Sequence, residues 1–339
     1  MQPSPKAKAA PDRRCTFRSD EGKQQLSIWP KTSGKRALVV LGLLVLLLLG
    51  AVGIDALALH NRVSRVSVAL PATQDGTTWV MVGSDSRSAV PPGPRYYGSV
   101  SQSPGAHADA VIVVHEGPTR TTILSIPRDV LVSPAPGEIS RLTFTFDQGP
   151  QQLINGLCRS LNIPASHLVV ITMSGFAAAV NDLHGVTIVN SAPTRDLLSG
   201  LDLMKVGQVH LDGTQALALV RSRSPQMLTP SGWVPASAAV GDKDRTRWLG
   251  AMFHSLATQA QEQSDNPFVL QKLVWDLTGS LTIDSHTSLL SLMRLNLKGA
   301  DVTELPVRVI GAGGIGATVD GASYGALAAA GYTQRCLTG

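Results

Sequence analysis

The chain has few cysteines and no recognisable metal-binding spacing. Three cysteines occur in 339 residues, and there is neither a Cys-x-x-Cys pair nor a His-x-x-x-His pair. Such spacings are typical of zinc sites, so the sequence does not favour a zinc protein. Cys15 precedes a long apolar run, whereas Cys158 and Cys336 follow it. We expect these two either to form a disulfide or to remain a buried thiol at 158 and a free thiol at 336.

Charged and aromatic side chains are also scarce, at 16% and 4% of the chain. The formal net charge is +5, but the first 36 residues hold nine Lys or Arg against three acidic residues. The rest of the chain is therefore close to neutral, which argues against nucleic-acid binding. The basic segment shows no helix-turn-helix pattern, and no internal repeat is visible. This composition is typical of a lean globular domain.

One long apolar run is present, at residues 37–54, and its 18 residues include no charge, amide or hydroxyl. A membrane-spanning helix needs about 17–25 such residues, whereas the apolar core of a signal peptide has about 7–15. Cleavage after the Ala-Leu-Ala at 56–58 is the less favoured alternative. Basic residues stay on the cytoplasmic side. We therefore expect a single-pass type II membrane protein, with a disordered cytoplasmic tail at 1–36, a transmembrane helix at 37–54 and an extracellular remainder.

The extracellular part alternates irregularly between strand-like and helix-like segments. Apolar, β-branched runs predict strands at 78–83, 109–115, 121–126, 168–173, 186–189 and 303–310. Helical spacing predicts helices at 151–161, 175–183, 214–220, 244–263, 268–281 and 287–296, and Pro, Gly and Ser predict loops at 88–105 and 225–241. This order indicates an α/β fold, a three-layer α/β/α sandwich on a mixed central sheet. We expect a linker at 55–77, the folded domain at 78–310 and a C-terminal tail at 311–339.

Acidic residues and arginines gather where these predicted elements end. They form the clusters Gly-Ser-Asp-Ser-Arg at 83–87, Ala-Asp at 108–109, Ser-Ile-Pro-Arg-Asp at 125–129, Arg-Ser-Arg at 221–223 and Asp-Lys-Asp-Arg-Thr-Arg at 242–247. Carboxylates bind hard cations through oxygen, and arginine binds phosphate through a planar fork. Together the clusters predict a Mg²⁺-assisted phosphoryl-transfer site, although each alone is typical of an ordinary surface ion pair. Ser125 lacks His and Asp partners at a recognisable spacing, so a serine hydrolase is not favoured.

In order and spacing, these clusters resemble the LytR-CpsA-Psr family over about residues 78–260, together with Asp-Leu-His-Gly-Val at 182–186 and the segment 211–223. The resemblance implies a membrane enzyme that transfers a glycopolymer from a polyprenyl-(pyro)phosphate carrier onto a peptidoglycan acceptor. Two alternatives remain, since water and a sugar hydroxyl compete for one phosphorus. The protein is then either a hydrolase of that carrier or a non-catalytic, lipid-binding envelope regulator.

The resemblance also implies roles for individual residues. Asp85 and Asp109 match the carboxylates that bind Mg²⁺, the expected cofactor, and a metal ligand is favoured over a general base because Mg²⁺ lowers the basicity of a carboxylate. Asp242 matches a further acidic residue, and Asp129 is expected to orient Arg128. The phosphate-binding arginines are matched by Arg87, Arg128, Arg221, Arg223 and Arg245. The lipid tail is expected against Phe144, Phe146, Leu153, Ile154, Leu157, Val170 and Phe176, for each of which ordinary core packing is the alternative.

The chain departs from the family pattern at three places. His107 stands where an arginine is usual, two residues before the second aspartate, and a charged imidazole would serve near phosphate. Residues 141–146 replace a Lys-x-Asn-x-Ala-Tyr stretch. Trp248 and Leu249 replace Arg-Gln, which removes two polar groups from the expected pocket entrance. The last change points to reduced activity or to a different acceptor or lipid.

Overall fold

The computed structural model describes residues 33–71, 75–85, 106–222, 224–236 and 266–295, with shorter stretches between 248 and 262 and between 297 and 336. The chain separates into two compact units, Met1–Asp55 and Ala56–Gly339. Helix α1 (Ser33–Arg62) includes Leu38–Arg62, which is long and apolar enough to cross a membrane. It extends past the predicted end at Ile54, so the expected linker begins as helix.

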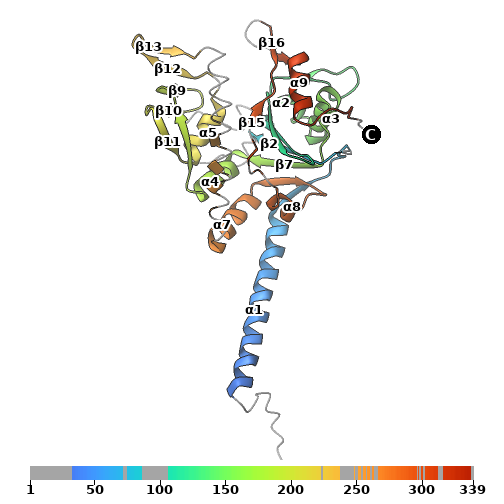
Figure 1. Ribbon diagram of the computed structural model, residues 1–339, viewed down its shortest axis with the longest axis vertical. Helices are drawn as coiled ribbons and strands as arrows, with labels where there is room; N and C mark the ends of the chain where they lie inside the picture. The colour runs from blue at the N-terminus through green and yellow to red at the C-terminus, as the bar shows by residue number, and fades with distance from the viewer. Residues whose placement is uncertain are drawn as a thin grey trace, which may run out of the picture. The chain divides into compact units, whose positions relative to one another are not determined.

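A seven-stranded sheet forms the centre of the second unit (Figure 1). Its strands, in spatial order, are β1 (Ser64–Val66), β14 (Leu281–Asp284), β7 (His167–Thr172), β2 (Thr77–Ser84), β3 (Ala108–Glu116), β4 (Thr121–Ile126) and β15 (Val302–Glu304). Strand β3 runs antiparallel to both β2 and β4, whereas β7 runs parallel to β2. The predicted mixed sheet is confirmed.

Helices cover both faces of this sheet, because side chains along each strand alternate between two cores. Along β2, Val80 and Val82 lie in the main core, whereas Trp79 and Met81 belong to the core of the opposite face. The main core is covered by α2 (Leu142–Thr145), α3 (Pro150–Leu161) and α9 (Gly321–Ala329), and the other by α7 (Pro267–Thr278) and α8 (Leu289–Met293). The predicted α/β/α sandwich is confirmed (Figure 1).

A smaller core lies around α4 (Met173–Asp182) and α5 (Gly213–Arg221). It includes residues of β8 (Val186–Asn190), which pairs with β11 (Gly207–Leu211), and of β10 (Leu201–Leu203). Strand β10 belongs to a four-stranded sheet with β9 (Thr194–Asp196), β12 (Gln226–Thr229) and β13 (Gly232–Pro235). The prediction of a loop over 225–241 is wrong for the β12–β13 hairpin. Its turn ends at Gly232, whose φ of +104° suits glycine.

The C-terminal third corrects further predictions. The helix expected at 268–281 ends at Thr278, and Leu281 already begins β14. The single strand expected at 303–310 is divided at Pro306, which cannot donate a backbone hydrogen bond, into β15 and β16 (Arg308–Ile310). The expected loop at 88–105 and most of the expected helix at 244–263 lie outside the described residues.

The segment expected as a tail, 311–339, contains β17 (Gly316–Thr318) and α9. Ala317, Leu327 and Tyr332 from this segment are buried in the main core. Cys336 forms a disulfide with Cys158 of α3, at a Cα–Cα distance of 5.2 Å and a sequence separation of 178 residues. The predicted disulfide is confirmed, and it attaches the C-terminal segment to the core.

Candidate functional site at one edge of the sheet

Four strand ends meet at one edge of the central sheet. Because β3 runs antiparallel to β2 and β4, and β7 runs parallel to β2, the start of β3 lies beside the ends of the other three strands. Asp85 directly follows β2, Asp109 lies at the start of β3, and Arg128 comes just after β4. The topology therefore gathers residues that the sequence separates.

Asp109 occupies an irregular position in the ladder between β2 and β3. Gly83 pairs with Ala110 and Ser84 pairs with Ala108, so the register shifts and Asp109 has no opposite residue on β2. A bulge of this kind bends a strand and redirects side chains, and it is common next to active sites. The bulge thus sets the direction of a predicted metal-binding carboxylate.

Asp85 is closely bound to His107, the residue that stands where the resemblance leads us to expect an arginine. Oδ1 of Asp85 accepts a hydrogen bond from the His107 backbone N–H at 2.6 Å and lies 3.3 Å from His107 Nδ1. In return, the Asp85 N–H donates to the His107 carbonyl at 3.1 Å. We call this pair the Asp85–His107 neck, because it closes the base of the intervening segment. Asp85 retains only 8% of its exposure, so its carboxylate has a fixed place.

Arg128 is held between two carboxylates. Its Nη1 donates to Asp109 Oδ1 at 2.7 Å, and its Nε lies 3.6 Å from Asp129 Oδ2. Arg141 also binds Asp129, at 3.3 Å, so Asp129 connects two guanidinium groups. The contact between Asp129 and Arg128 agrees with the expected orienting role.

Arg141 and Phe144 extend the site. The Arg141 guanidinium carbon lies 4.2 Å from the centre of the Phe144 ring, and that ring meets His107 edge-on at 5.5 Å. Arg141 ends β6 (Ser140–Arg141), which pairs with β5 (Leu131–Val132) just after Arg128. The sequence indicated Arg141 only as part of a departure from the family pattern, where a basic residue was the available signal.

Arg221 reaches the same sheet edge from a different element. It ends α5, and its Nη1 lies 3.3 Å from Met173 Sδ. Met173 begins α4 directly after Thr172, and Thr172 pairs with Ser84, the residue before Asp85. The predicted phosphate ligands Arg128 and Arg221 are therefore both at the edge that carries the two aspartates.

Other predicted residues are placed differently. Leu153, Ile154 and Leu157 are fully buried on α3 in the main core, and Phe146 packs partly buried against them, as core packing would require. Phe144 differs, because it is 37% exposed beside the polar site. Val170 is also in the main core, and Phe176 packs against the smaller one. Binding of a lipid tail by these residues stays a prediction.

Several predicted residues lie outside the described part of the chain: Arg87, Arg223, Asp242, Arg245 and Leu249. Trp248 is described. It is buried in the smaller core, and its indole N–H donates to the Val189 carbonyl at 3.3 Å. Trp248 therefore serves as a core residue there.

The two aspartates offer oxygen ligands that suit one mode of divalent-cation binding. Among the described residues, no group of three or more His, Cys, Asp or Glu could form a metal cage. Mg²⁺, however, commonly takes one or two carboxylates together with substrate phosphates. Asp85 and Asp109, on adjacent strands beside two arginines, fit that shared mode of binding.

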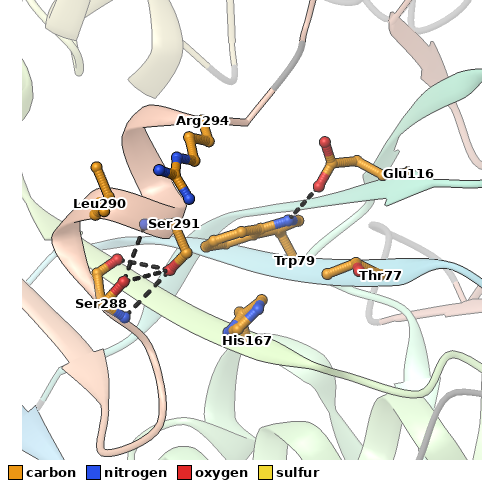
Figure 2. Close-up of a pocket in the computed structure, with 8 residues that line it drawn as sticks. All are labelled: Thr77, Trp79, Glu116, His167, Ser288, Leu290, Ser291 and Arg294. Carbon is orange, nitrogen blue, oxygen red and sulfur yellow. Dashed lines mark hydrogen bonds between the residues drawn. The ribbon is translucent and has the colours of Figure 1, made fainter.

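A cavity of about 340 Å³ lies at the opposite end of β2. Figure 2 shows its lining: Thr77, Trp79, Glu116, His167, Ser288, Leu290, Ser291 and Arg294. Trp79 donates to Glu116 at 2.9 Å and stacks on His167, and burial lowers the pKa of that histidine although Asp284 and Glu116 oppose the shift. A strand rises about 3.3 Å per residue, so β2 separates this cavity from Asp85 by roughly 25 Å. The cavity is not part of the aspartate–arginine site.

Comparisons with known proteins agree with the fold. The LytR_cpsA_psr family model matches residues 53–331. The chain is 30% identical over 253 residues to the probable cell wall biosynthesis protein LcpB of Corynebacterium glutamicum, covering 72% of this chain but only 57% of that relative. A LytR-Csp2A-Psr enzyme from Actinomyces oris is 31% identical with a TM-score of 0.67, covering 80% of this chain and 97% of the other. A structure of TagT bound to LI-WTA shares the fold, with 17% identity, a TM-score of 0.54 and coverage of 78% and 96%.

Proposed function

The chain belongs to the LytR-CpsA-Psr family of cell wall biosynthesis proteins, and from this premise we propose that it is a Mg²⁺-dependent glycopolymer phosphotransferase. Its donor is a glycopolymer on a polyprenyl-(pyro)phosphate carrier, and its acceptor is a peptidoglycan hydroxyl. Helix α1 anchors it in the cell membrane with the site outside. The relative from A. oris is described as an enzyme, and TagT as bound to LI-WTA, which supports this class of activity and substrate.

One observation supports the proposal most directly. The Arg128 guanidinium donates a hydrogen bond to Asp109 at the start of β3, and Asp85 follows the neighbouring end of β2. Phosphoryl transfer needs positive charge around the phosphate oxygens and a fixed geometry. Arg128 and Arg221 supply charge from two elements. The aspartates supply oxygen ligands, and Asp109 also holds Arg128 in place.

These residues divide the work of the proposed reaction. The arginines bind the phosphates and stabilise the charge that spreads over them as the transition state forms. A sugar hydroxyl of the acceptor attacks the sugar-proximal phosphorus, the bond from this phosphorus to the bridging oxygen breaks, and polyprenyl phosphate leaves. The hydroxyl proton passes to solvent. When bound, Mg²⁺ would neutralise phosphate charge next to Asp85 and Asp109.

The test is transfer by the full-length protein from a synthetic lipid-pyrophosphate sugar to a peptidoglycan fragment, followed by mass spectrometry. Asp85→Asn and Asp109→Asn keep a carbonyl oxygen for His107 or Arg128 but lose the charge. Each should raise the activation free energy of transfer by about 3 kcal/mol, which lowers the rate roughly a hundredfold. EDTA should lower the rate to the same extent. Asp202→Asn, at an exposed position on β10, is the matched control and should keep full activity.

The products also decide between the alternatives. A phosphodiester-linked conjugate supports transfer. Release of free sugar phosphate in the presence of acceptor would identify a hydrolase, and binding of the carrier without turnover would identify a lipid-binding regulator. Full activity in EDTA would contradict the role assigned to Asp85 and Asp109.

A further inference from the structure

Helix α7 exposes an aromatic stripe. Phe268, Gln271, Lys272 and Trp275 are exposed at i, i+3, i+4 and i+7, so they share one face, whereas Leu273 on another face is buried. The exposed fractions of Phe268 and Trp275 are 84% and 36%. The chain has only six Phe and five Trp, so two exposed aromatic residues on one short helix are notable. Exposed apolar groups of this kind mark a surface that meets a partner or a membrane.

A contact with the end of α1 indicates that the stripe lies next to a membrane rather than a protein partner. The Arg62 guanidinium carbon lies 4.4 Å from the centre of the Trp275 ring, and a side chain added at Gly279 would come within 2.9 Å of Arg62 Nη2. Arg62 is the last residue of α1 and of its membrane-crossing stretch, and Val63 after it is buried. The aromatic stripe is therefore attached at the point where the apolar helix ends.

The distance along the helix is short. A hydrocarbon core of about 30 Å takes about 20 helical residues at 1.5 Å per residue, so counted from Leu38 it ends near Leu57, and Arg62 lies about 7.5 Å further along α1. The headgroup region of one leaflet is about 5–8 Å deep. Trp275, in contact with Arg62, is thus within reach of the headgroups. Tryptophan and phenylalanine are favoured at that depth.

Charge contributes little to this face. Lys272 is paired with both Asp182 and Asp276, and Arg62 also lies near Asp276, so the two positive charges are balanced by two carboxylates. Leu290 of α8, which packs on the same sheet face as α7, adds a further side chain that is 55% exposed. The attraction to a bilayer is therefore apolar rather than electrostatic.

We propose that α7 is an interfacial membrane-docking helix, which rests on the outer leaflet with Phe268 and Trp275 among the lipid headgroups. This inference rests on the membrane anchoring in the proposed function, but not on catalysis. Docking holds the folded unit close to the bilayer beyond the constraint of α1.

The test uses the full-length protein with Cys15→Ser and Gln271→Cys, spin-labelled on the stripe, at one copy per phosphatidylcholine nanodisc. Electron paramagnetic resonance then measures the access of oxygen, which partitions into lipid, and of a water-soluble nickel complex. We expect high oxygen and low nickel access at 271. A label placed by Asp202→Cys on exposed β10 should show the reverse.

Phe268→Ser with Trp275→Ser should abolish the protection from nickel, and Phe268→Ser alone should reduce it without touching the contact with Arg62. Tyr324→Ser, which removes a 47% exposed aromatic residue from α9, is the matched control and should change nothing. Replacing part of the lipid with phosphatidylglycerol should leave the result unchanged, and a requirement for the anionic lipid would overturn the apolar mode.

Two results would overturn the docking proposal itself. Free nickel access at 271 would show that the stripe faces water, and low access of both reagents would show burial against protein. The transfer assay on the same sample distinguishes a failure of the docking proposal from a failure of the proposed function. Transfer without protection contradicts docking alone, and protection without transfer contradicts the phosphotransferase alone.

Discussion

Arg128 shows at the scale of a residue how the fold fixes the direction of a charged group. Asp109 binds its Nη1 and Asp129 lies near its Nε, so the planar group is fixed from two sides. A planar guanidinium offers parallel donors to phosphate oxygens, whereas the lysine ammonium is a single point charge. The arrangement therefore depends on shape as well as on charge.

We expect Arg128→Lys and Arg221→Lys to reduce transfer by roughly 10- to 100-fold, since a hydrogen bond to a charged group contributes about 1.5–3 kcal/mol. The rate of conjugate formation measures the effect. Arg308→Lys, at an exposed position of β16, should retain the unaltered rate. Lysine variants with normal rates would show that the arginines act only as diffuse positive charge.

Asp284 has a structural role far from the arginines. It is fully buried and accepts hydrogen bonds from the backbone N–H of Leu168 at 2.9 Å and of His286 at 2.8 Å, and from the Thr287 hydroxyl. Burial alone would raise its pKa, but these hydrogen bonds, with that of Thr287 foremost, lower the pKa below its ordinary value. The carboxylate joins β14 to the start of β7.

Asp284→Asn should therefore lower the free energy of unfolding by about 1–3 kcal/mol at neutral pH, because the amide nitrogen cannot accept the donated protons. A lowered pKa stabilises the fold above the ordinary carboxyl value of about 3.9, and this contribution is lost as the pH falls through the folded-state value. The difference between the variant and the unaltered protein should shrink in acid. Urea titrations across that range measure it, and a constant difference would contradict the ionised role.

At the scale of elements, α4 and α5 place Met173 and Arg221 together because their backbones approach closely. A Cβ at Gly213, the first residue of α5, would overlap the Ala177 carbonyl oxygen of α4. Asp212 and Gln215 form a capping box that fixes the start of α5. The position of Arg221 thus depends on a glycine eight residues earlier.

Gly213→Ala should destabilise the protein by about 1–3 kcal/mol, as overpacking does, and should also lower transfer through Arg221. Gly325→Ala is the matched control, since this helical glycine in α9 has no atom within 4 Å of an added Cβ. It should raise stability by about 0.5–1 kcal/mol. Thermal unfolding measures the melting temperature of both variants. Equal changes in melting temperature would exclude the steric explanation for Gly213.

The central strands could be predicted because buried strands are continuous apolar runs, as in 109–115 and 121–126. The short strands could not. Only Gly279 and Ser280 separate β14 from the preceding helix, and β12 and β13 lie among Pro, Ser and Gly. Their pairing depends on tertiary neighbours rather than on local pattern.

The site shows the same division. Strand ends, carboxylates and arginines were visible in the sequence, and they placed Asp85, Asp109 and Arg128 correctly at element boundaries. The bulge at Asp109 and the stacking of Arg141 on Phe144 were not visible, since both arise from contacts between segments. The motifs predicted which groups gather at the site, and the fold shows how the described ones are held.

At the scale of the whole molecule, the disulfide joins distant parts of the chain. It connects α3, in the layer over the main core, to the segment after α9. Such a crosslink shortens the unfolded chain and persists in an oxidising compartment. It therefore agrees with a domain that works outside the cytoplasm.

Cys158→Ser with Cys336→Ser should lower the free energy of unfolding by about 2–5 kcal/mol. Urea unfolding without reductant measures this loss. Reductant should lower the free energy of unfolding of the unaltered protein to that of the double variant. Cys15→Ser should leave this free energy unchanged. Identical midpoints for the double variant and the unaltered protein would contradict a stabilising crosslink.

The Asp85–His107 neck has a consequence for the spacing of the two carboxylates. Because the two residues bond to each other at the base of the segment between them, the positions of Asp85 and Asp109 are set by the neck and the sheet. The spacing of the two carboxylates is therefore built into the backbone ladder and one backbone-to-carboxylate bond, so the pair is held as a unit by the sheet.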